Sequence, residues 1–304
     1  MHCLSCNSNN SSLVIETMDV EYFSTDKKYK YFRCNDCEAM SISPVPINDL
    51  STIYPNNYYS FQDQKDNFVQ KIKQYLEIIL FKKIIRKINT TGTLKVLDIG
   101  GGSGWMLNTI SKATTKKIEG TIVDIDDKAK NIAERDGYTY INNTVENFST
   151  GKKYNLILLL NLIEHIADPT ATLNKLSEYL EPGGIILIKT PNIDSLDFRI
   201  FKNTYWGGLH CPRHWILFNK NSFKKMINRT NLKILELRYT QGAPFWTWSS
   251  LHFLHRFKLV TFSRLKPIPY SKLAPIFNIV FAIFDFLRLP FFKTSQFFIL
   301  LSKE

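Results

Sequence analysis

A glycine-rich stretch separates a short apolar run from a segment with helical character. Gly100, Gly102 and Gly104 let the backbone bend sharply and let a ligand come close to the main chain. The amides that open the next helix would point at that ligand. A tryptophan occupies the position of the third glycine in a dinucleotide-binding turn, and Asp98 gives the spacing D-x-G-x-G-x-G instead. A carboxylate at the strand end suits a ligand with a cationic amino-acid head, although an ordinary glycine turn is the alternative.

Histidines and aromatic rings crowd the segment 205–218. Histidine titrates near neutrality and can therefore take a proton from a hydroxyl group. We expect three histidines beside one cleft, with His214 favoured as the general base, His165 second and His210 also a candidate. A single histidine more often has a structural role, but three beside one cleft favour a catalytic role for one of them.

The same segment supplies the predicted substrate contacts, which are planar or cationic: Tyr205, Trp206, Arg213 and Trp215. Arg213 could bind a phosphate or carboxylate with two hydrogen bonds. The tryptophans could stack on a sugar face or an isoprenoid chain. The alternatives are a helix-cap or surface role for the arginine and core packing for the tryptophans.

Four of the five cysteines form two C-x2-C pairs: Cys3, Cys6, Cys34 and Cys37. Four thiolates match the tetrahedral preference of Zn²⁺. A hairpin of Leu13–Ile15 with Tyr29–Phe32 would bring the two pairs together. Unrelated buried thiols and a redox pair are the alternatives, and we favour a structural zinc that folds a segment too small for its own core.

Alternating apolar runs and helical patterns must position these groups. Strands are predicted at 95–99, 118–124, 138–142, 154–160 and 184–190, with a sixth at 232–238 and a seventh at 295–302. Helices between consecutive strands indicate a parallel sheet that is covered on both faces. We therefore predict an α/β fold with a doubly wound, seven-stranded, mostly parallel Rossmann-like sheet.

Polar residues follow several of these strands, where ligands of such sheets bind. Asp124 lies 20 residues beyond Gly104 and could accept both hydroxyls of a ribose. The stretch Asn142–Phe148 could meet an adenine edge. Asn161–His165 and Thr190–Asn192 close the next two strands.

Together these motifs resemble a class I S-adenosylmethionine-dependent methyltransferase over about residues 90–240. The motifs are D-I-G-G-G-S-G at 98–104, Asp124, N-L-I-E-H at 161–165, L-E-P-G-G at 180–184 and T-P-N at 190–192. The resemblance implies that the glycines pass along the methionine part of the cofactor and that Asp124 holds the ribose. The remaining cofactor contacts would be Asp98, Asn161, Thr144 and Val145, with Thr144 where the family usually has an acidic residue.

The cysteine segment resembles a subgroup of these enzymes that often acts in sugar, polysaccharide or lipid-linked glycan biosynthesis. The predicted domains are a zinc-knuckle segment at 1–45, a linker and helix at 46–92, a methyltransferase core at 93–242 plus 293–304, and an insertion at 243–292. In the linker, Tyr54, Tyr58 and Tyr59 could cap a ligand site or pack against the core, and a helix is predicted from Gln64 to Asn89.

The composition of the chain limits the partners and the cellular compartment that we expect. The formal net charge of +12 favours an anionic partner. The first residues of this sequence lack the charged and apolar regions of a signal peptide, and no run of eighteen apolar residues occurs, so we expect no signal peptide and a cytoplasmic chain with reduced cysteines. The insertion mixes apolar and basic residues, which suits a lid or a dimer interface and also a peripheral contact with the inner face of the cell membrane.

The leading functional hypothesis is methylation of a sugar or glycan hydroxyl, with lipid-linked intermediates included. Methylation of a prenylated quinone or lipid phenol is the alternative within the same chemistry. A nucleic-acid-binding module is the alternative of another class. We expect no nucleic-acid partner, because the basic residues are spread along the chain and do not cluster with stacking aromatics. A catalytically dead scaffold is disfavoured by the intact glycine turn and Asp124.

Overall fold

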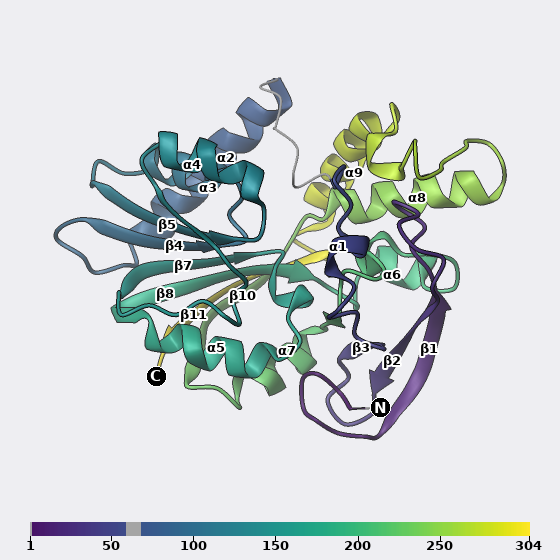
Figure 1. Cartoon of the computed structure of the whole chain (residues 1–304), viewed down its shortest axis with the longest axis horizontal. Coiled ribbons are helices and arrows are strands. Elements are labelled where there is room, and N and C mark those ends of the chain that lie inside the picture. The colour runs from purple at the N-terminus through teal and green to yellow at the C-terminus, as the bar shows by residue number, and fades with distance from the viewer. Residues whose placement is uncertain (1, 59–67) are drawn as a thin grey trace.

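The computed structural model describes residues 2–58 and 68–304 (Figure 1). Within these residues the larger sheet has seven strands in the order β10-β11-β8-β7-β4-β5-β6. They are β4 (Leu94–Ile99), β5 (Ile118–Asp124), β6 (Thr139–Asn142), β7 (Tyr154–Leu160), β8 (Leu180–Pro191), β10 (Leu232–Thr240) and β11 (Gln296–Lys303). All neighbouring pairs from β8 to β6 are parallel, and β11 is antiparallel to both of its neighbours. The predicted fold class is confirmed.

Helices cover both faces of this sheet (Figure 1). One face carries α2 (Phe68–Ile85), α3 (Trp105–Ser111) and α4 (Asp127–Arg135), and the other carries α5 (Pro169–Glu178) and α7 (Lys220–Ile227). Because both faces are covered, the strands are apolar on both sides, and successive residues point to opposite faces. Leu156 and Leu158 of β7 pack in one core, whereas Ile157 and Leu159 pack in the other.

The smaller sheet joins the N-terminal segment to a distant part of the chain. Its strands are β1 (Ser11–Thr17), β2 (Tyr29–Cys34), β3 (Met40–Ser43) and β9 (Ile216–Leu217). The predicted hairpin is confirmed, since Leu13 pairs with Phe32 and Ile15 with Tyr31. β9 pairs with β3 through Met40 and Leu217. The segment predicted to bind the substrate therefore completes the N-terminal sheet.

The linker between the two sheets is partly helical. It contains a single-turn helix, α1 (Leu50–Ile53). The predicted helix that begins at Gln64 appears as α2, and its residues before 68 lie outside the described part of the chain, as does Tyr59.

The insertion folds as two helices, α8 (Ala243–Arg256) and α9 (Ala274–Arg288), between strands β10 and β11. α8 lies close to the 3-10 turn Gly207–Leu209, where the Gly207 amide donates to Ser249 Oγ over 2.8 Å. A Cβ on Gly207 would lie 2.5 Å from the Phe245 carbonyl oxygen, so only glycine permits this approach. Among the helices that the structure describes, none has both the length and the apolar character needed to cross a membrane.

Candidate active site

The glycine turn joins β4 to α3 at the carboxyl edge of the large sheet. Gly100, Gly102 and Gly104 have φ angles of +74°, +51° and +85°, in the left-handed region that favours glycine. A Cβ on Gly102 would meet no described atom within 4 Å, so the main chain is open to a ligand there. Gly104 caps α3 without a side-chain hydrogen bond, which leaves the helix amides facing the same space.

Two carboxylates lie beside this turn. Asp124 accepts hydrogen bonds from the amides of Gly102 (2.8 Å) and Asp126 (3.0 Å). Asp98 is buried, and its Oδ2 has no hydrogen-bond partner among the described residues. Burial, followed by the charge of Asp124, raises the pKa of Asp98 to about 8. Burial also raises the pKa of Asp124. A cationic ligand group beside Asp98 would supply the missing hydrogen bond and favour the ionised carboxylate.

The other predicted cofactor contacts lie in loops at the same edge. Val145 is buried in the core, and Thr144 is half-buried with its hydroxyl accepting from the Asn147 amide at 3.4 Å. Asn161 has a φ of +56° directly after β7, and its Oδ1 accepts from Gln296 Nε2. These positions leave the cofactor roles of the three residues as predictions.

The structure brings the three predicted histidines together. His165 comes from the 3-10 turn after β7, and His210 and His214 come from the segment after β8. The ring centroid of His214 lies 4.7 Å from that of His165 and 5.0 Å from that of His210. We call these three residues the histidine cluster.

Hydrogen bonding assigns the tautomer of His214. Its Nδ1 lies 2.8 Å from the Gly208 carbonyl oxygen, which can only accept, so Nδ1 carries the hydrogen and Nε2 keeps its lone pair. Burial, followed by the proximity of His165 and His210, lowers the pKa of His214 well below its usual value. His214 is therefore neutral at physiological pH, and its Nε2 can accept a proton.

The other two histidines are held by the N-terminal segment. His165 Nδ1 lies 2.8 Å from the Tyr54 hydroxyl, and burial is the main reason that the pKa of His165 falls to about 3. His210 contacts the Glu21 carboxylate through Nδ1 and the Tyr58 hydroxyl through Nε2, the latter at 3.0 Å. Both ring nitrogens of His210 are engaged, so this geometry favours a positioning role.

Glu164 is a site residue that the sequence argument did not single out. It is fully buried, and burial raises its pKa to about 8. Its Oε2 accepts from Thr190 Oγ1 at 2.9 Å, while Oε1 lies 3.8 Å from His214 Nε2. Ligand atoms of Glu164, His165 and His214 lie within 4.8 Å of one another, so this group could also hold a divalent cation. The sequence feature that could have identified Glu164 is its position beside His165 in the N-L-I-E-H motif.

The predicted substrate residues lie deeper than expected. Arg213 is fully buried, donates to Asp19 Oδ2 over 2.7 Å and to the Ile53 carbonyl over 2.6 Å, and lies over the Tyr22 ring. Arg213 therefore pairs with a carboxylate of the chain itself, and its predicted contact with a substrate stays a prediction.

Trp206 is also fully buried, and its indole nitrogen donates to Asp197 over 2.6 Å, which is the core role given as the alternative. The Tyr205 hydroxyl donates to Glu21 Oε1 over 2.7 Å, and Trp215 is 4% exposed. In this structure none of these four side chains forms an exposed substrate surface.

The cysteine pairs also converge. Sulfur atoms of Cys3 and Cys37 lie 3.5 Å apart, as do those of Cys6 and Cys34, and all four lie within 4.8 Å of one another. The residue after each pair has a left-handed backbone: Asn7 with φ +60° and Glu38 with φ +73°. The two turns thus share one shape, which is suited to holding one tetrahedral metal ion.

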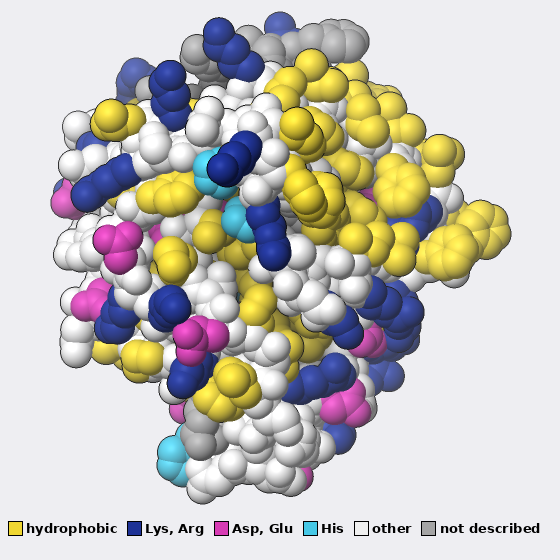
Figure 2. Space-filling model, turned by 90° about the vertical axis from the view of Figure 1, so that its right-hand side faces the viewer, with side chains coloured by type: hydrophobic (Ala, Val, Ile, Leu, Met, Phe, Trp, Pro, Cys, Tyr) yellow, Lys and Arg dark blue, Asp and Glu magenta, His cyan; other side chains and the backbone are white. Residues whose placement is uncertain are grey.

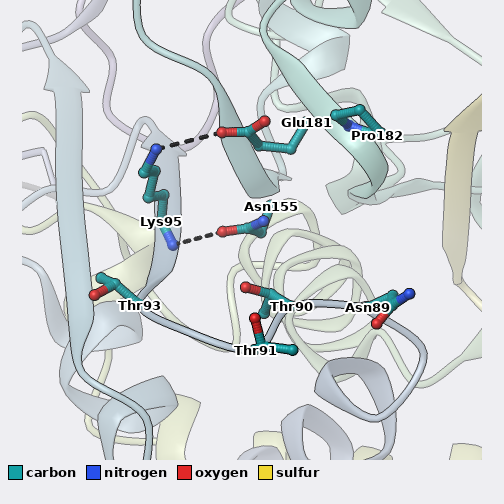
Figure 3. A pocket seen from close by; sticks show the side chains of 8 residues that line it. All are labelled: Asn89, Thr90, Thr91, Thr93, Lys95, Asn155, Glu181 and Pro182. Carbon is teal, nitrogen blue, oxygen red and sulfur yellow. Dashed lines mark hydrogen bonds and ion pairs between the residues drawn. The ribbon is translucent and has the colours of Figure 1, made fainter.

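One hollow of the surface lies away from these groups. It has a volume of about 430 Å³ and is lined by residues such as Thr93, Asn155 and Pro182 (Figure 3). Lys95 crosses it, with Nζ 3.3 Å from Glu181 Oε1 and its amide donating to Asn155. These residues stand where β4, β7 and β8 begin, and ligands of parallel sheets bind at the opposite ends.

Comparisons with known proteins bear on the family and the fold. A family model described as a methyltransferase domain matches residues 61–237. A ubiquinone biosynthesis O-methyltransferase of Bradyrhizobium diazoefficiens is 26% identical over 190 residues, which cover 56% of this chain and 72% of that protein. The protein of the same name in Cereibacter sphaeroides (strain ATCC 17025) is 32% identical over 171 residues, covering 51% and 67%.

A solved structure also matches in fold. Coclaurine N-methyltransferase, bound to N-methylheliamine and SAH, aligns with a TM-score of 0.52 at 14% identity, over 86% of this chain and 80% of that one. At this identity the likeness concerns the fold alone.

Proposed function

The chain belongs to the methyltransferase-domain family and is an S-adenosylmethionine-dependent methyltransferase, and we propose that it methylates a hydroxyl on a phenol or quinol ring with an apolar prenyl tail. The observation that carries the chemistry is the neutral His214, whose Nε2 keeps its lone pair within the histidine cluster.

The residues beside the glycine turn fit the cofactor. When bound, S-adenosylmethionine would supply an electrophilic methyl carbon attached to a sulfonium sulfur, and the sulfur would keep the electron pair of the C–S bond. Asp98 offers a buried carboxyl oxygen, unpartnered among the described residues, to the ammonium of the amino-acid part. The open main chain at Gly102 leaves room beside it, and Asp124 retains lone pairs for ribose hydroxyls.

The histidine cluster would remove the acceptor's proton. As the hydroxyl oxygen forms its bond to the methyl carbon, the O–H bond breaks and the proton goes to Nε2 of His214. The Gly208 carbonyl holds the Nδ1–H of the resulting imidazolium. A phenol has a pKa of about 10, so its proton is more easily taken by such a base than that of an aliphatic alcohol.

The acceptor class rests on the relatives. Two proteins named for ubiquinone biosynthesis match half or more of this chain, which favours a prenylated quinone precursor over the sugar hydroxyl predicted first. A sugar or lipid-linked glycan stays the second candidate, because the spacing of the four cysteines in the sequence resembles that of enzymes in polysaccharide biosynthesis.

We also propose that the four cysteines bind one structural Zn²⁺. The ion would fix the turn of each cysteine pair and thereby hold the β1–β2 hairpin, whose connecting loop carries Glu21. Zinc would thus act on the active site through Glu21 and His210, without chemistry of its own.

An acceptor panel tests this function. Purified protein with labelled S-adenosylmethionine is offered a short-chain prenylated catechol, a nucleotide sugar and a lipid-linked sugar, each with and without EDTA. We expect label on the catechol alone, and no activity that depends on added Mg²⁺. Transfer to either sugar substrate and not to the catechol would overturn the proposed acceptor. Loss of transfer in EDTA, restored by added Mg²⁺, would replace the general-base role of His214 by metal binding at Glu164, His165 and His214.

A further inference from the structure

The outer face of the insertion is unusually apolar for a surface. On α9 the exposed apolar residues recur three or four positions apart: Ile276, Ile279, Val280, Ile283, Phe286 and Leu287. This spacing places them on one side of the helix. Phe257 and Leu259 after α8, and Phe291 and Phe292 after α9, are each at least 60% exposed. Figure 2 shows apolar side chains gathered over the upper part of this side of the molecule.

This face is fixed in place by the opposite side of α9. Phe281 stacks on Trp246 of α8 with ring centroids 5.3 Å apart, and Thr247 donates to Asn278 over 2.9 Å. Asp285 accepts from the Gly242 amide at 3.0 Å and the Trp246 indole at 3.2 Å. The helix is therefore held on α8 by specific contacts, which leave its apolar side turned outward.

The exposed charges within the insertion all have one sign, although Lys293 pairs with Asp194 outside it over 2.9 Å. Asp285 is the one acidic residue between 242 and 294, and it is buried. The exposed charged residues of the same stretch are all basic: Arg256, Lys258, Arg264, Lys266, Lys272 and Lys293. Pairing with a second copy would bring these cations together without acidic partners. An anionic lipid surface offers both the negative charge and the apolar interior that this face matches.

We propose that this apolar face of α9 and its two flanking loops, here called the lipid face, binds the surface of an anionic bilayer. Apolar side chains enter the headgroup region while the basic residues contact lipid phosphates. The inference goes beyond the proposed acceptor and does not depend on it.

The lipid face is one helix away from the active site. Trp248 of α8 stacks on His210 with ring centroids 5.4 Å apart, and Trp246 of the same helix stacks on α9. Helices pack at about 8–10 Å between axes, so a bound bilayer would lie close to the histidine cluster. A membrane-dissolved acceptor could then reach the site without leaving the bilayer completely.

Vesicle co-sedimentation tests the lipid face. The full chain is mixed with vesicles of phosphatidylcholine alone or with phosphatidylglycerol, and an Ile279→Glu/Ile283→Glu variant is compared with an Ile200→Glu/Leu235→Glu control. The control residues are 55% and 47% exposed, close to the 44% and 56% of the tested pair. A second variant, Lys266→Gln/Lys272→Gln, changes charge without touching the apolar stripe.

We expect binding to phosphatidylglycerol vesicles that falls roughly a hundredfold in the Ile279→Glu/Ile283→Glu variant and stays unchanged in the control. The lysine variant should bind more weakly and lose part of the salt dependence. Equal vesicle binding by all variants would overturn the proposal. A second result would also overturn the proposal: the protein is a dimer in solution, and the Ile279→Glu/Ile283→Glu variant is a monomer that binds vesicles as well as wild type. The apolar face would then join two copies of the chain. Transfer to a soluble acceptor should be unchanged in the glutamate variant, which separates this result from failure of the proposed function.

Discussion

Replacing Asp98 by asparagine should make the unliganded protein more stable at neutral and alkaline pH while it weakens cofactor binding. The pKa of Asp98 is raised from 3.8 to about 8 because the carboxyl is buried beside Asp124. The folded state therefore binds a proton that the unfolded state releases, so stability falls as pH rises from about 4 to about 8. Asparagine has no such titration.

The size of the effect follows from the shift. Each pH unit within this window costs the wild type about 1.4 kcal/mol of unfolding free energy from this one group. Between pH 5 and pH 8 the Asp98→Asn variant should therefore gain about 3 kcal/mol relative to wild type, with about 4 kcal/mol as the upper bound. Comparing the two proteins at both pH values cancels the part of the substitution that does not depend on pH.

Urea unfolding at pH 5, 6.5 and 8 without ligand measures this difference, and titration calorimetry measures S-adenosylmethionine affinity for both proteins. Other raised carboxyls, such as Glu164, titrate in both proteins and cancel in the comparison. A stability difference that stays constant from pH 5 to pH 8 would refute the raised pKa. Unchanged cofactor affinity in the variant would refute the contact between Asp98 and the cofactor.

Three further substitutions follow from the geometry. His214→Ala should lower kcat about 10²- to 10⁴-fold, because the proposed base is removed. His255 is half-buried and lies outside the histidine cluster, so His255→Ala should change kcat little. Equal kcat in the two variants would exclude His214 as the base. Arg213→Met should lower the unfolding free energy measured in urea by about 3–5 kcal/mol, because Asp19 is left as a buried, unpaired charge. Adding Asp19→Leu should restore part of this loss. An unchanged unfolding free energy in Arg213→Met would show that the ion pair does not stabilise the fold. Cys34→Ser should remove bound zinc by elemental analysis and speed proteolysis of the N-terminal segment; zinc retained at full stoichiometry would contradict the four-cysteine site.

Local pattern was enough to place the large sheet. The run at 154–160 is apolar at nearly every position, and the glycine turn after Asp98 marks the edge where ligands bind, so strands and cofactor edge could be read from neighbouring residues. The β1–β2 hairpin followed from the need to bring two cysteine pairs together.

Contacts between distant segments escaped the same reasoning. Nothing near Arg213 in the chain signals that Asp19, 194 residues away, lies against it, and an arginine in a predicted cleft is more readily assigned to a substrate. Glu21 reaches His210 from a loop without regular pattern. β9 has two residues, too few for a strand signal, and it becomes a strand because β3 lies beside it.

The most direct measurement of the central claim is product analysis after incubation with trideuteriomethyl S-adenosylmethionine and a prenylated catechol. The account predicts one labelled methyl group on a ring oxygen of the catechol, formed by wild type and His255→Ala and nearly lost in His214→Ala. Label on carbon or nitrogen, or full activity without His214, would contradict hydroxyl methylation through this histidine.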